Sequence, residues 1–413
     1  MKKSSESLAL VSLGCAKNAV DLQVMAGNLV KAGATLSPDP DRADTVIVNT
    51  CAFIASAREE AEAEIRRALE LKARGNYKKV VVTGCYPKRY PKAVAAFPGV
   101  DVWQGVPEKW IEPKIPALRF TGKAFAYLKI AEGCAHRCSY CAIPGIRGKY
   151  RSRPMASILK EAKALIESGC KELNIVAQDP MLYGVDLGDH KVKLTKLLWK
   201  LDAIPGDFWI RVLYSYPSEI TEEFLEWMVN SEHAVRYIDI PLQHTVPEVL
   251  VNMNRKSAID ASLEAASVLR ELIPDITLRT TIMTGFPGET ELRFKRLLSD
   301  LRRMQFDHLG CFAYSPEEGT KGAKMKGRPS RRQAEEREKQ VMAEAKALWA
   351  VKAKRMLKKE FVALTIAPGV ARMESQAPDV DGVVYLDKEV EVGEFVKIRL
   401  AKVAGFDFEA EVL

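Results

Sequence analysis

Short apolar runs alternate with longer helical patterns in the first part of the chain. Residues 8–13, 45–49 and 79–83 form continuous apolar runs, whereas residues 16–32 and 55–73 have the spacing of helices. Continuous apolar strands separated by helices are typical of a parallel sheet that helices cover. The pattern therefore predicts an N-terminal parallel-sheet α/β domain, which we place at residues 1–120.

A second α/β series follows, and we assign it to residues 121–350. Strands are expected at six places, each followed by a helical stretch: residues 126–130, 172–176, 209–213, 237–240, 277–283 and 308–312. Consecutive strand–helix units of this number predict a barrel or partial barrel of parallel strands. The charged stretch 331–359 predicts one long helix, which we interpret as a solvated connector.

The pattern changes again near the C-terminus, where short alternating strands replace the helices. Residues 383–386, 395–400 and 408–412 have the pattern of strands, and Gly and Asp separate them. This spacing predicts a small antiparallel β-barrel at residues 351–413. The chain as a whole is expected to be an α/β protein of three parts.

Composition narrows the class of protein. Of the 413 residues, 47% are apolar and 28% are charged, as in ordinary globular proteins. No apolar run approaches the roughly 20 residues that span a bilayer. Glu6 and the short apolar run 8–13 argue against a secretory signal, so we expect a cytoplasmic protein with no membrane partner. In that compartment, eight cysteines are expected to serve metal binding or catalysis rather than disulfides.

The strongest local motif is a C-x₃-C-x₂-C run formed by Cys134, Cys138 and Cys141, directly after an expected strand. Three thiolates at this spacing can ligate three irons of one [4Fe–4S] cube, which leaves the fourth iron without a protein ligand. That iron can chelate the amine and carboxylate of S-adenosylmethionine (SAM). A zinc knuckle is the alternative, but it requires a fourth nearby Cys or His, and no second C-x₂-C follows.

Three further cysteines share one local pattern. Cys15, Cys51 and Cys85 each stand just past an expected parallel strand, and each follows a small residue. The carboxyl ends of parallel strands open onto one edge of a sheet, so these thiols are expected to converge there on a second cluster. Three unrelated buried cysteines are the alternative. Cys170 and Cys311 do not belong to either group of three cysteines, and we interpret both as packing residues.

At these six cysteines the chain resembles the methylthiotransferase family of radical-SAM enzymes, over nearly its whole length. The resemblance implies an N-terminal domain with an auxiliary cluster, a radical-SAM barrel and a C-terminal TRAM domain. It also implies SAM and two [4Fe–4S] clusters. The first cluster would cleave SAM to a 5′-deoxyadenosyl radical, and the second would hold the sulfur that is transferred. The implied ligand sets are Cys134, Cys138, Cys141 for the first cluster and Cys15, Cys51, Cys85 for the second.

Several runs are similar to the branch of this family that methylthiolates an aspartate β-carbon on small ribosomal subunit protein twelve. They include SLGCAKNAVD at 12–21, AIPGIRGKYRSRP at 142–154, DIPLQH at 239–244, GFPGET at 285–290 and APDVDGVVYL at 377–386. The resemblance implies that protein as substrate, ribosomal RNA as a further contact and an external electron donor. Ala16, Pro180, Met181 and Pro247 depart from the branch's pattern, in loops near the expected pocket.

No catalytic residue is assigned beyond the cluster ligands. Tyr140 lies between two of them and is a candidate for packing near the adenine of SAM; a plain hydrophobic contact is the alternative. Gln178, Arg211 and Gln243 end successive barrel strands, where barrel enzymes carry their chemistry. Each of the three is a candidate SAM contact, with a structural hydrogen bond as the alternative.

The charge distribution bears on the substrate. Residues 361–413 contain five basic and ten acidic residues, a net charge of −5, although the whole chain carries +8. A domain that grips RNA phosphates should be basic, whereas an acidic one suits a basic ribosomal protein. A face that is acidic merely for solubility is also common. The alternatives are a tRNA adenosine methylthiotransferase of the same family and a non-catalytic iron–sulfur electron carrier or redox sensor.

Overall fold

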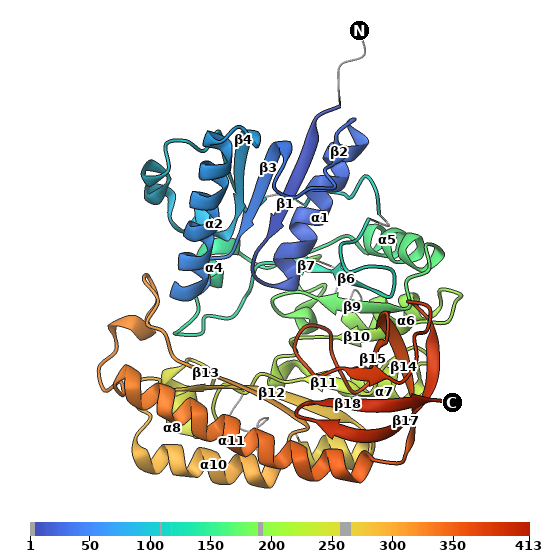
Figure 1. Cartoon of the computed structure of the whole chain (residues 1–413). Helices are drawn as coiled ribbons and strands as arrows, with labels where there is room; N and C mark the ends of the chain where they lie inside the picture. Colours follow the sequence, from blue (N-terminus) through green and yellow to red (C-terminus); the bar gives the residue numbers. More distant parts are fainter. Residues whose placement is uncertain (1–4, 108–109, 117, 189–192, 257–265) are drawn as a thin grey trace. The chain divides into compact units, whose positions relative to one another are not determined.

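The computed structural model describes residues 5–107, 110–116, 118–188, 193–256 and 266–413 (Figure 1). These residues fall into two compact units. Unit 1 comprises Met1–Phe120, Tyr127–His136 and Cys141–Leu165, and unit 2 comprises Thr121–Ala126, Arg137–Tyr140 and Ile166–Leu413. Within the described ranges, no helix combines the length and apolar character needed to cross a bilayer. The division into three domains at residues 120 and 350 stays a prediction.

Unit 1 is built on a five-stranded sheet in the order β2-β1-β3-β4-β5, and every neighbouring pair is parallel. Its strands are β1 (Ser7–Ser12), β2 (Thr35–Leu36), β3 (Ala43–Thr50), β4 (Tyr77–Gly84) and β5 (Val102–Gly105). The helices along this part of the chain are α1 (Ala16–Lys31), α2 (Ala55–Ala73), α3 (Cys85–Arg89) and the 3₁₀ turn η1 (Pro91–Ala96). The predicted N-terminal parallel-sheet α/β fold is thus confirmed.

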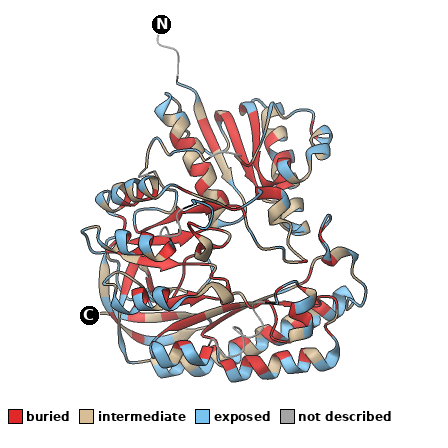
Figure 2. Cartoon of the chain, turned by 180° about the vertical axis from the view of Figure 1, so that it is seen from behind, coloured by how far each residue is buried: buried red, intermediate tan, exposed pale blue. Residues whose placement is uncertain are grey.

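Alternate residues of the central strands are buried against different helices. Val46 and Val48 of β3 pack in one cluster with Ile65 of α2, whereas Ile47 packs in another with Leu22 of α1. Successive side chains of a strand point to opposite faces, so α1 and α2 cover opposite faces of the sheet. Burial on both faces explains why these strands are continuous apolar runs, and Figure 2 shows them as buried.

The strand order reverses between β1 and β3, because the chain moves from β1 to the edge strand β2 and then returns to β3. Ligands of doubly wound sheets bind outside the carboxyl ends of the strands at such a reversal. Strands β2 and β5 were not predicted from the sequence. The first has only two residues, and the second has an exposed residue at every other position, so neither forms an apolar run.

Two short strands of unit 1 flank the loop that carries the C-x₃-C-x₂-C motif. Strands β7 (Ala131–Glu132) and β8 (Arg151–Ser152) pair antiparallel, so the residues before and after the loop lie side by side. Between them lies the short helix α4 (Ile143–Arg147), and α5 (Met155–Glu167) follows β8. The hairpin-like pairing of β7 with β8 fixes both ends of the loop that carries Cys134, Cys138 and Cys141.

Six strands form the partial barrel that the sequence predicts, and the pairs β9–β10, β11–β12 and β12–β13 are parallel. They pair as β10-β9-β6 and β11-β12-β13, and an isolated parallel bridge from Ile210 to Ala234 connects the two groups. The strands are β6 (Phe125–Lys129), β9 (Glu172–Val176), β10 (Trp209–Val212), β11 (Tyr237–Asp239), β12 (Thr277–Thr284) and β13 (His308–Ala313). Between them lie η2 (Pro180–Leu182), α6 (Leu194–Asp202), η3 (Pro217–Glu219), α7 (Glu222–Asn230), α8 (Pro247–Asn252) and α10 (Glu291–Met304).

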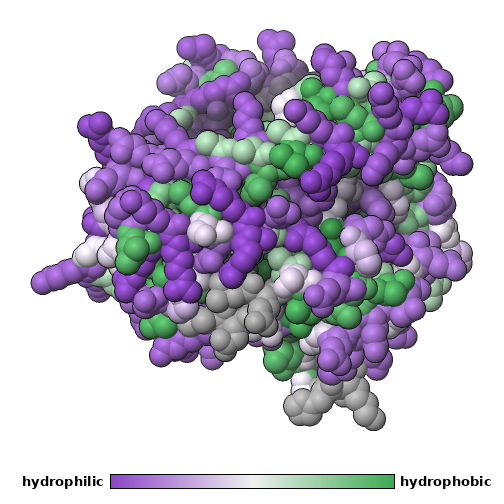
Figure 3. Space-filling model, turned by 90° about the horizontal axis from the view of Figure 1, so that it is seen from below, coloured by the Kyte–Doolittle hydropathy of each residue, from purple (hydrophilic) through white to green (hydrophobic). Residues whose placement is uncertain are grey.

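The long charged helix expected at residues 331–359 is α11 (Arg331–Met356), which begins with a capping box on Ser330; the short turn η4 (Gly322–Lys324) precedes it. Its buried residues recur every three or four positions, from Ala334 to Ala353, so one stripe packs against the protein. The helix is therefore more than a solvated connector. Helices α10 and α11 run along the face shown in Figure 3, where most side chains are hydrophilic.

The C-terminal residues form a closed five-stranded barrel in the order β14-β15-β16-β18-β17. All pairs are antiparallel except β16 with β18, which is parallel and differs from the expected antiparallel pattern. Trp349 of α11 packs into the barrel core, and its indole N–H donates to the Gly405 carbonyl at 2.9 Å. The strands are β14 (Glu360–Ala367), β15 (Val370–Met373), β16 (Val384–Leu386), β17 (Phe395–Ala404) and β18 (Asp407–Val412).

Two buried ion clusters hold this C-terminal barrel against the strands of unit 2. Glu172 of β9 accepts from Arg211 Nε at 2.7 Å and also pairs with Arg372 of β15. Burial raises the pKa of the Glu172 carboxyl, but the two guanidinium groups outweigh it and hold the pKa below its usual value. In the second cluster, Asp381 accepts from the Tyr237 hydroxyl at 2.8 Å and pairs with Arg279.

Replacing Glu172 with Gln should destabilise unit 2 strongly, because both arginines would keep their charge without a carboxylate. Breaking a buried ion pair on one side typically costs about 3–5 kcal/mol. As a control, Glu223→Gln removes an exposed pair with Lys193 and should cost less than about 1 kcal/mol. Chemical denaturation followed by circular dichroism measures both. Equal, small losses for the two variants would contradict a supporting role for the buried cluster.

Candidate functional site

The structure places Cys15, Cys51 and Cys85 at the carboxyl ends of three adjacent parallel strands. Cys15 is the N-cap of α1 after β1, Cys51 directly follows β3, and Cys85 begins α3 directly after β4. Strands β1, β3 and β4 are neighbours, and β1 and β3 flank the reversal of strand order. The three thiols thus lie along one sheet edge, as the sequence predicts, at the position where such sheets bind ligands.

Two glycines allow the backbone to approach the thiols closely. Gly14 has φ +88°, and a Cβ there would lie 2.6 Å from Cys51 Cβ and 3.0 Å from Cys51 Sγ. Gly84 has φ +95°, and a Cβ there would lie 2.5 Å from the Thr50 carbonyl oxygen. Any other residue would require both an unfavourable backbone conformation and displacement of the cysteine-bearing turn. The lack of room for a Cβ therefore explains why glycine precedes Cys15 and Cys85.

The three thiols are close enough to influence one another's ionisation. Burial raises the pKa of Cys85 to about 11; the charge of Arg147 is the largest opposing influence, and the neighbouring Cys51 and Cys15 add smaller increases. Burial and the neighbouring Cys15 likewise raise the pKa of Cys51. Bringing three thiolates together is costly unless cations compensate them. A metal cluster, whose irons each take one thiolate, would provide that compensation.

Arg147 is the cation that the protein itself supplies at this edge. Its side chain is almost wholly buried, and Nη2 donates to Cys85 Sγ at 3.4 Å and to Asn18 Oδ1 at 3.1 Å. Nη1 pairs with Asp21 at 2.8 Å and with Glu132 at 3.0 Å. Arg147 lies on α4, after the C-x₃-C-x₂-C loop, whereas Asn18 and Asp21 lie on α1 after Cys15. Arg147 therefore belongs to the segment that follows the C-x₃-C-x₂-C motif, but its side chain contacts Cys85 and the helix that follows Cys15.

Lys129 completes this ion cluster by pairing with both Asp21 and Glu132. Burial would raise the pKa of Glu132, but Lys129 and Arg147 overcome it and lower the pKa to about 2. The sequence analysis did not identify Asp21, Glu132 or Arg147 as functional. A lysine within the buried strand β6 was an available signal, since a buried cation needs an anionic partner.

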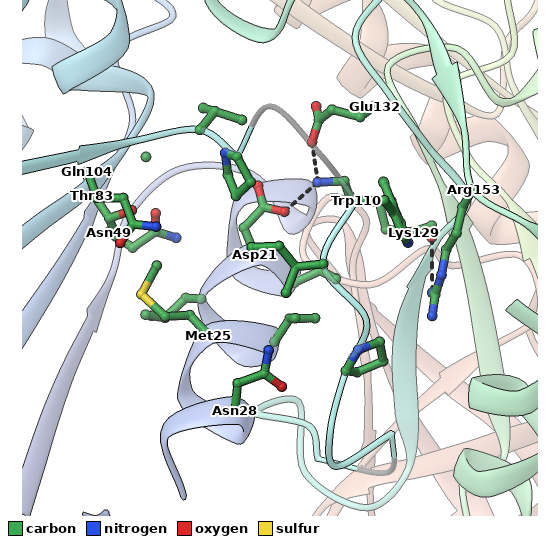
Figure 4. A pocket seen from close by; sticks show the side chains of 18 of the residues that line it. Asp21, Met25, Asn28, Asn49, Thr83, Gln104, Trp110, Lys129, Glu132 and Arg153 are labelled. Carbon is green, nitrogen blue, oxygen red and sulfur yellow. Dashed lines mark hydrogen bonds and ion pairs between the residues drawn. The ribbon is translucent and has the colours of Figure 1, made fainter. Parts of the chain in front are cut away.

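A cavity of about 190 Å³ lies beside this ion cluster. Figure 4 shows Asn49 and Thr83, each two residues before a cysteine, on one side of it, and Lys129 on the other, with Asp21 between them. The cavity is smaller than the roughly 300–1,000 Å³ typical of sites for larger organic ligands. It can therefore accommodate only a small molecule near the thiol-bearing strand ends.

The other three cysteines lie in the loop between β7 and α4. Gly133 begins it with φ +75°, and a Cβ there would lie 2.3 Å from the Lys149 carbonyl oxygen. The Cys134 N–H faces the Gly148 carbonyl at 3.4 Å, and the Ile143 N–H donates to Cys141 Sγ at 3.4 Å. Backbone contacts thus shape the loop at both ends. A backbone N–H that faces a sulfur suits a thiolate ligand of an iron–sulfur cluster.

Cys138 and Tyr140 are held within unit 2 by Arg255. Arg255 Nη1 lies 3.8 Å from Cys138 Sγ and 3.4 Å from the Tyr140 hydroxyl, and Nη2 donates to the Pro241 carbonyl at 2.8 Å. The Tyr140 ring also packs edge-on against Phe286, with 6.2 Å between centroids. Both interpretations of Tyr140, a SAM contact and a packing residue, thus stay open. Arg255 is a candidate site residue that the sequence analysis did not identify.

The other proposed SAM contacts differ in their surroundings. Gln243 is buried with φ +69°, a strained conformation for a residue other than glycine, and its side-chain oxygen has no hydrogen-bond partner among the described residues. The buried hydroxyls of Ser215, after β10, and Thr245, after β11, also have no hydrogen-bond partner among the described residues. Unpartnered buried polar atoms at the carboxyl ends of barrel strands fit a polar ligand such as SAM.

Arg211 and Gln178 have weaker support as SAM contacts. Arg211 is completely buried, pairs with Glu172 and donates to the Glu374 carbonyl at 2.7 Å, which supports the structural alternative, whereas its Nη2 has no hydrogen-bond partner among the described residues. Gln178 is half-buried just after β9. The remaining cysteines behave as packing residues: Cys170 is buried with its thiol on the Glu172 carbonyl, and burial raises the pKa of Cys311.

The residues that depart from the family pattern all lie at the beginnings of helical segments. Ala16 is the first residue of α1, Pro180 begins η2 and Pro247 begins α8. Proline is well tolerated at the first position of a helix because no backbone donor is lost there. The side chain of Asp179 accepts from the Met181 N–H at 3.0 Å, which caps η2. The unusual residues are thus compatible with the local backbone.

No group of three or more His, Cys, Asp or Glu side chains in the described ranges surrounds the position of a single metal ion. A [4Fe–4S] cube is a different requirement, because each iron takes its own thiolate and the thiolates stand further apart. The thiols of Cys15, Cys51 and Cys85 lie beside the buried Arg147 and the closely packed Gly14 and Gly84, and this donor set matches the chemistry of such a cube.

Comparison with known families decides the class of protein. Three family models match the chain: the Radical SAM superfamily at residues 128–301, uncharacterized protein family UPF0004 at 7–105 and the TRAM domain at 366–413. The ribosomal protein uS12 methylthiotransferase RimO of Geobacter sulfurreducens is 38% identical over the full length of both chains. The RimO of Moorella thermoacetica is 40% identical over 98% of this chain and 99% of its own. This chain belongs to the RimO methylthiotransferase family.

Membership of the RimO family makes the chain a radical-SAM transferase of sulfur-containing groups that uses SAM and a [4Fe–4S] cluster. Solved structures support the fold. The radical SAM methyltransferase TsrM of Kitasatospora setae superposes with a TM-score of 0.52 at 17% identity, over 76% of this chain and 77% of that one. The cobalamin-dependent radical enzyme OxsB gives a TM-score of 0.54 at 12% identity, over 77% and 54%. At these identities the likeness concerns the fold alone.

Substituting Gly14 with Ala should lower the iron bound per chain, because the new Cβ would displace Cys51. The matched control is Gly33→Ala, which has the same left-handed backbone at φ +110° but nothing within 4 Å of the new Cβ. Each variant incurs the conformational cost of about 1–2 kcal/mol. Iron and acid-labile sulfide are assayed after anaerobic reconstitution. Equal iron contents in the two variants would contradict the close approach of Gly14 to a cluster ligand.

Proposed function

We propose that this chain methylthiolates the β-carbon of an aspartate on small ribosomal subunit protein twelve. The observation that carries the proposal is the full-length similarity to proteins named uS12 methylthiotransferase, at 37–40% identity. The similarity spans the thiol-bearing sheet, the barrel and the C-terminal barrel alike.

We further propose that the chain holds two [4Fe–4S] clusters. Cys134, Cys138 and Cys141 are the proposed ligands of the first, and Cys15, Cys51 and Cys85 those of the second. When bound, the first supplies the electron for reductive cleavage of SAM, and the second supplies the sulfur to be transferred. Each trio of thiolates leaves one iron without a protein ligand, so each site can bind a small molecule.

The chain's own residues would position SAM and exclude water. Tyr140, next to the cluster ligand Cys141, is proposed to pack beside the adenine. The side-chain oxygen of Gln243 is a buried acceptor that suits an amino group. Gln178 is kept as a proposed contact, whereas the buried ion pair of Arg211 leaves that residue a structural role. The buried floor of the barrel would keep a radical away from solvent.

The acidic C-terminal barrel suits a protein substrate. Asp387, Glu389, Glu391 and Glu394, between β16 and the start of β17, are all exposed. Ribosomal proteins are basic because they bind RNA, so complementary charge would attract them to this surface. A surface that binds RNA is basic, because positive charge attracts phosphates, whereas this acidic surface would repel them. The charge therefore favours the ribosomal protein over tRNA as substrate, and the basic remainder of the chain is proposed to contact ribosomal RNA.

An external one-electron donor is part of the proposal, because reductive cleavage of SAM consumes an electron that the chain must receive. We place the reaction in the cytoplasm, where ribosomal proteins are made and assembled.

Replacing each cysteine trio by Ala should separate the two sites. The Cys134/Cys138/Cys141 variant should form no 5′-deoxyadenosine from SAM under reducing conditions. The Cys15/Cys51/Cys85 variant should lose about half of its iron but still cleave SAM, since one of two equal clusters remains. A Cys170/Cys311 double variant serves as control and should keep all its iron. Deoxyadenosine formation without the first trio, or full iron without the second, would refute the assignments.

The substrate is tested by mass spectrometry of cells with and without the gene. Ribosomal protein twelve should lose the mass of one methylthio group when the gene is deleted, and the wild-type gene should restore it. The Cys134/Cys138/Cys141 variant should not. A methylthio group that disappears from tRNA while the ribosomal protein is unchanged would replace this proposal with the tRNA function.

A further inference from the structure

Arg255 is a buried cation directly beside a proposed cluster ligand. Only 4% of the residue is exposed, and the guanidinium lies 3.8 Å from Cys138 Sγ. It also lies over the Tyr216 ring, 4.2 Å from the centroid. A hydrogen bond from Nη2 to the Pro241 carbonyl fixes the side chain so that Nη1 faces the sulfur. The orientation toward Cys138 is therefore imposed by the barrel.

Arg255 differs from the other buried arginines in its counter-ions. The other five in the described part of the chain each pair with a carboxylate: Arg147 with Asp21 and Glu132, Arg153 with Glu161, Arg211 and Arg372 with Glu172, and Arg337 with Glu289. No carboxylate of a described residue lies within salt-bridge distance of Arg255. Its polar partners there are a thiol, a phenol and a carbonyl.

A buried guanidinium without an anion is strongly unfavourable, so the fold implies an anion at this position. An oxidised [4Fe–4S] core bound by three thiolates carries one net negative charge, and reduction adds a second. Such a cluster on Cys138 would place its charge beside Nη1. Hydrogen bonds to the sulfurs and nearby charge are the factors by which a protein sets the potential of an iron–sulfur cluster.

We propose that Arg255 is the built-in counter-charge of the cluster ligated by Cys138 and that it raises the reduction potential of this cluster. The inference rests on the proposed function only in taking Cys138 as a ligand. Because the reduced cluster carries more negative charge, a fixed cation stabilises it more than the oxidised one. The electron comes from a low-potential one-electron donor, no proton is transferred, and Arg255 itself is unchanged. Arg255 is thus a positioning residue that acts through Cys138 and Tyr140.

The test is a redox titration of the full-length chain, followed by the electron paramagnetic resonance signal of the reduced cluster. The Cys15/Cys51/Cys85→Ala background isolates the signal of the radical-SAM cluster. Arg255→Met should make reduction at least tenfold less favourable, which is a shift of about 59 mV for a one-electron couple. Arg255→Lys, which keeps the charge, should shift it less. Arg236→Met removes an exposed, carboxylate-paired arginine and should leave the potential unchanged.

Each outcome decides the proposal. A midpoint in Arg255→Met equal to that of the parent would overturn it, as would an equal shift in Arg236→Met. Should Arg255→Met bind no iron, Arg255→Lys becomes the deciding variant. A cluster retained with Lys supports the charge requirement, whereas its loss with Lys shows that the fold needs the shape of the side chain and refutes the counter-charge. If removing Cys138 itself leaves iron and potential unaltered, the ligand assignment fails instead.

Discussion

The common edge on which parallel strands end is the constraint that organises the N-terminal unit. Strands β1, β3 and β4 run in one direction, so the residues that follow them emerge at the same edge. Three cysteines far apart in sequence meet there without any local motif. The edge can hold a bulky group only because Gly14 and Gly84 let adjacent turns approach within contact distance. Strand direction and backbone space together create the site.

Much of this architecture could be predicted because burial on both faces leaves a clear pattern. Strands β1, β3 and β4 contain continuous apolar runs, whereas the buried barrel strands β9 and β10 combine apolar residues with the charged residues Glu172 and Arg211. Strands β2 and β5 lie at sheet edges, where half-exposed or very short segments carry no such pattern. The parallel pairing of β16 with β18 depends on barrel closure, which strand-by-strand periodicity does not encode.

The cysteines were easier to predict than the groups around them. Thiols are few, and their spacing or position after strands is informative in itself. Arginines are common, and nothing in the sequence separates Arg147 and Arg255 from the exposed ones. Their importance appears only when burial and partners are known: Arg147 belongs to a cluster with two carboxylates, whereas Arg255 contacts a thiol and a phenol. Cys85 and Cys138 therefore lie in different electrostatic surroundings, although each contacts a buried arginine.

The ion clusters around Glu172 and Asp381 have a mechanical consequence. They join the C-terminal barrel to β9, β10, β11 and β12 through contacts that are shielded from water and salt. Buried contacts of this kind restrict movement of the module at its point of attachment. A macromolecule that docks on the exposed acidic loop of that module would be presented to the barrel at a constant distance. The length of the substrate's own protruding segment would then limit which residue reaches the barrel, so recognition would depend on that length as well as on charge.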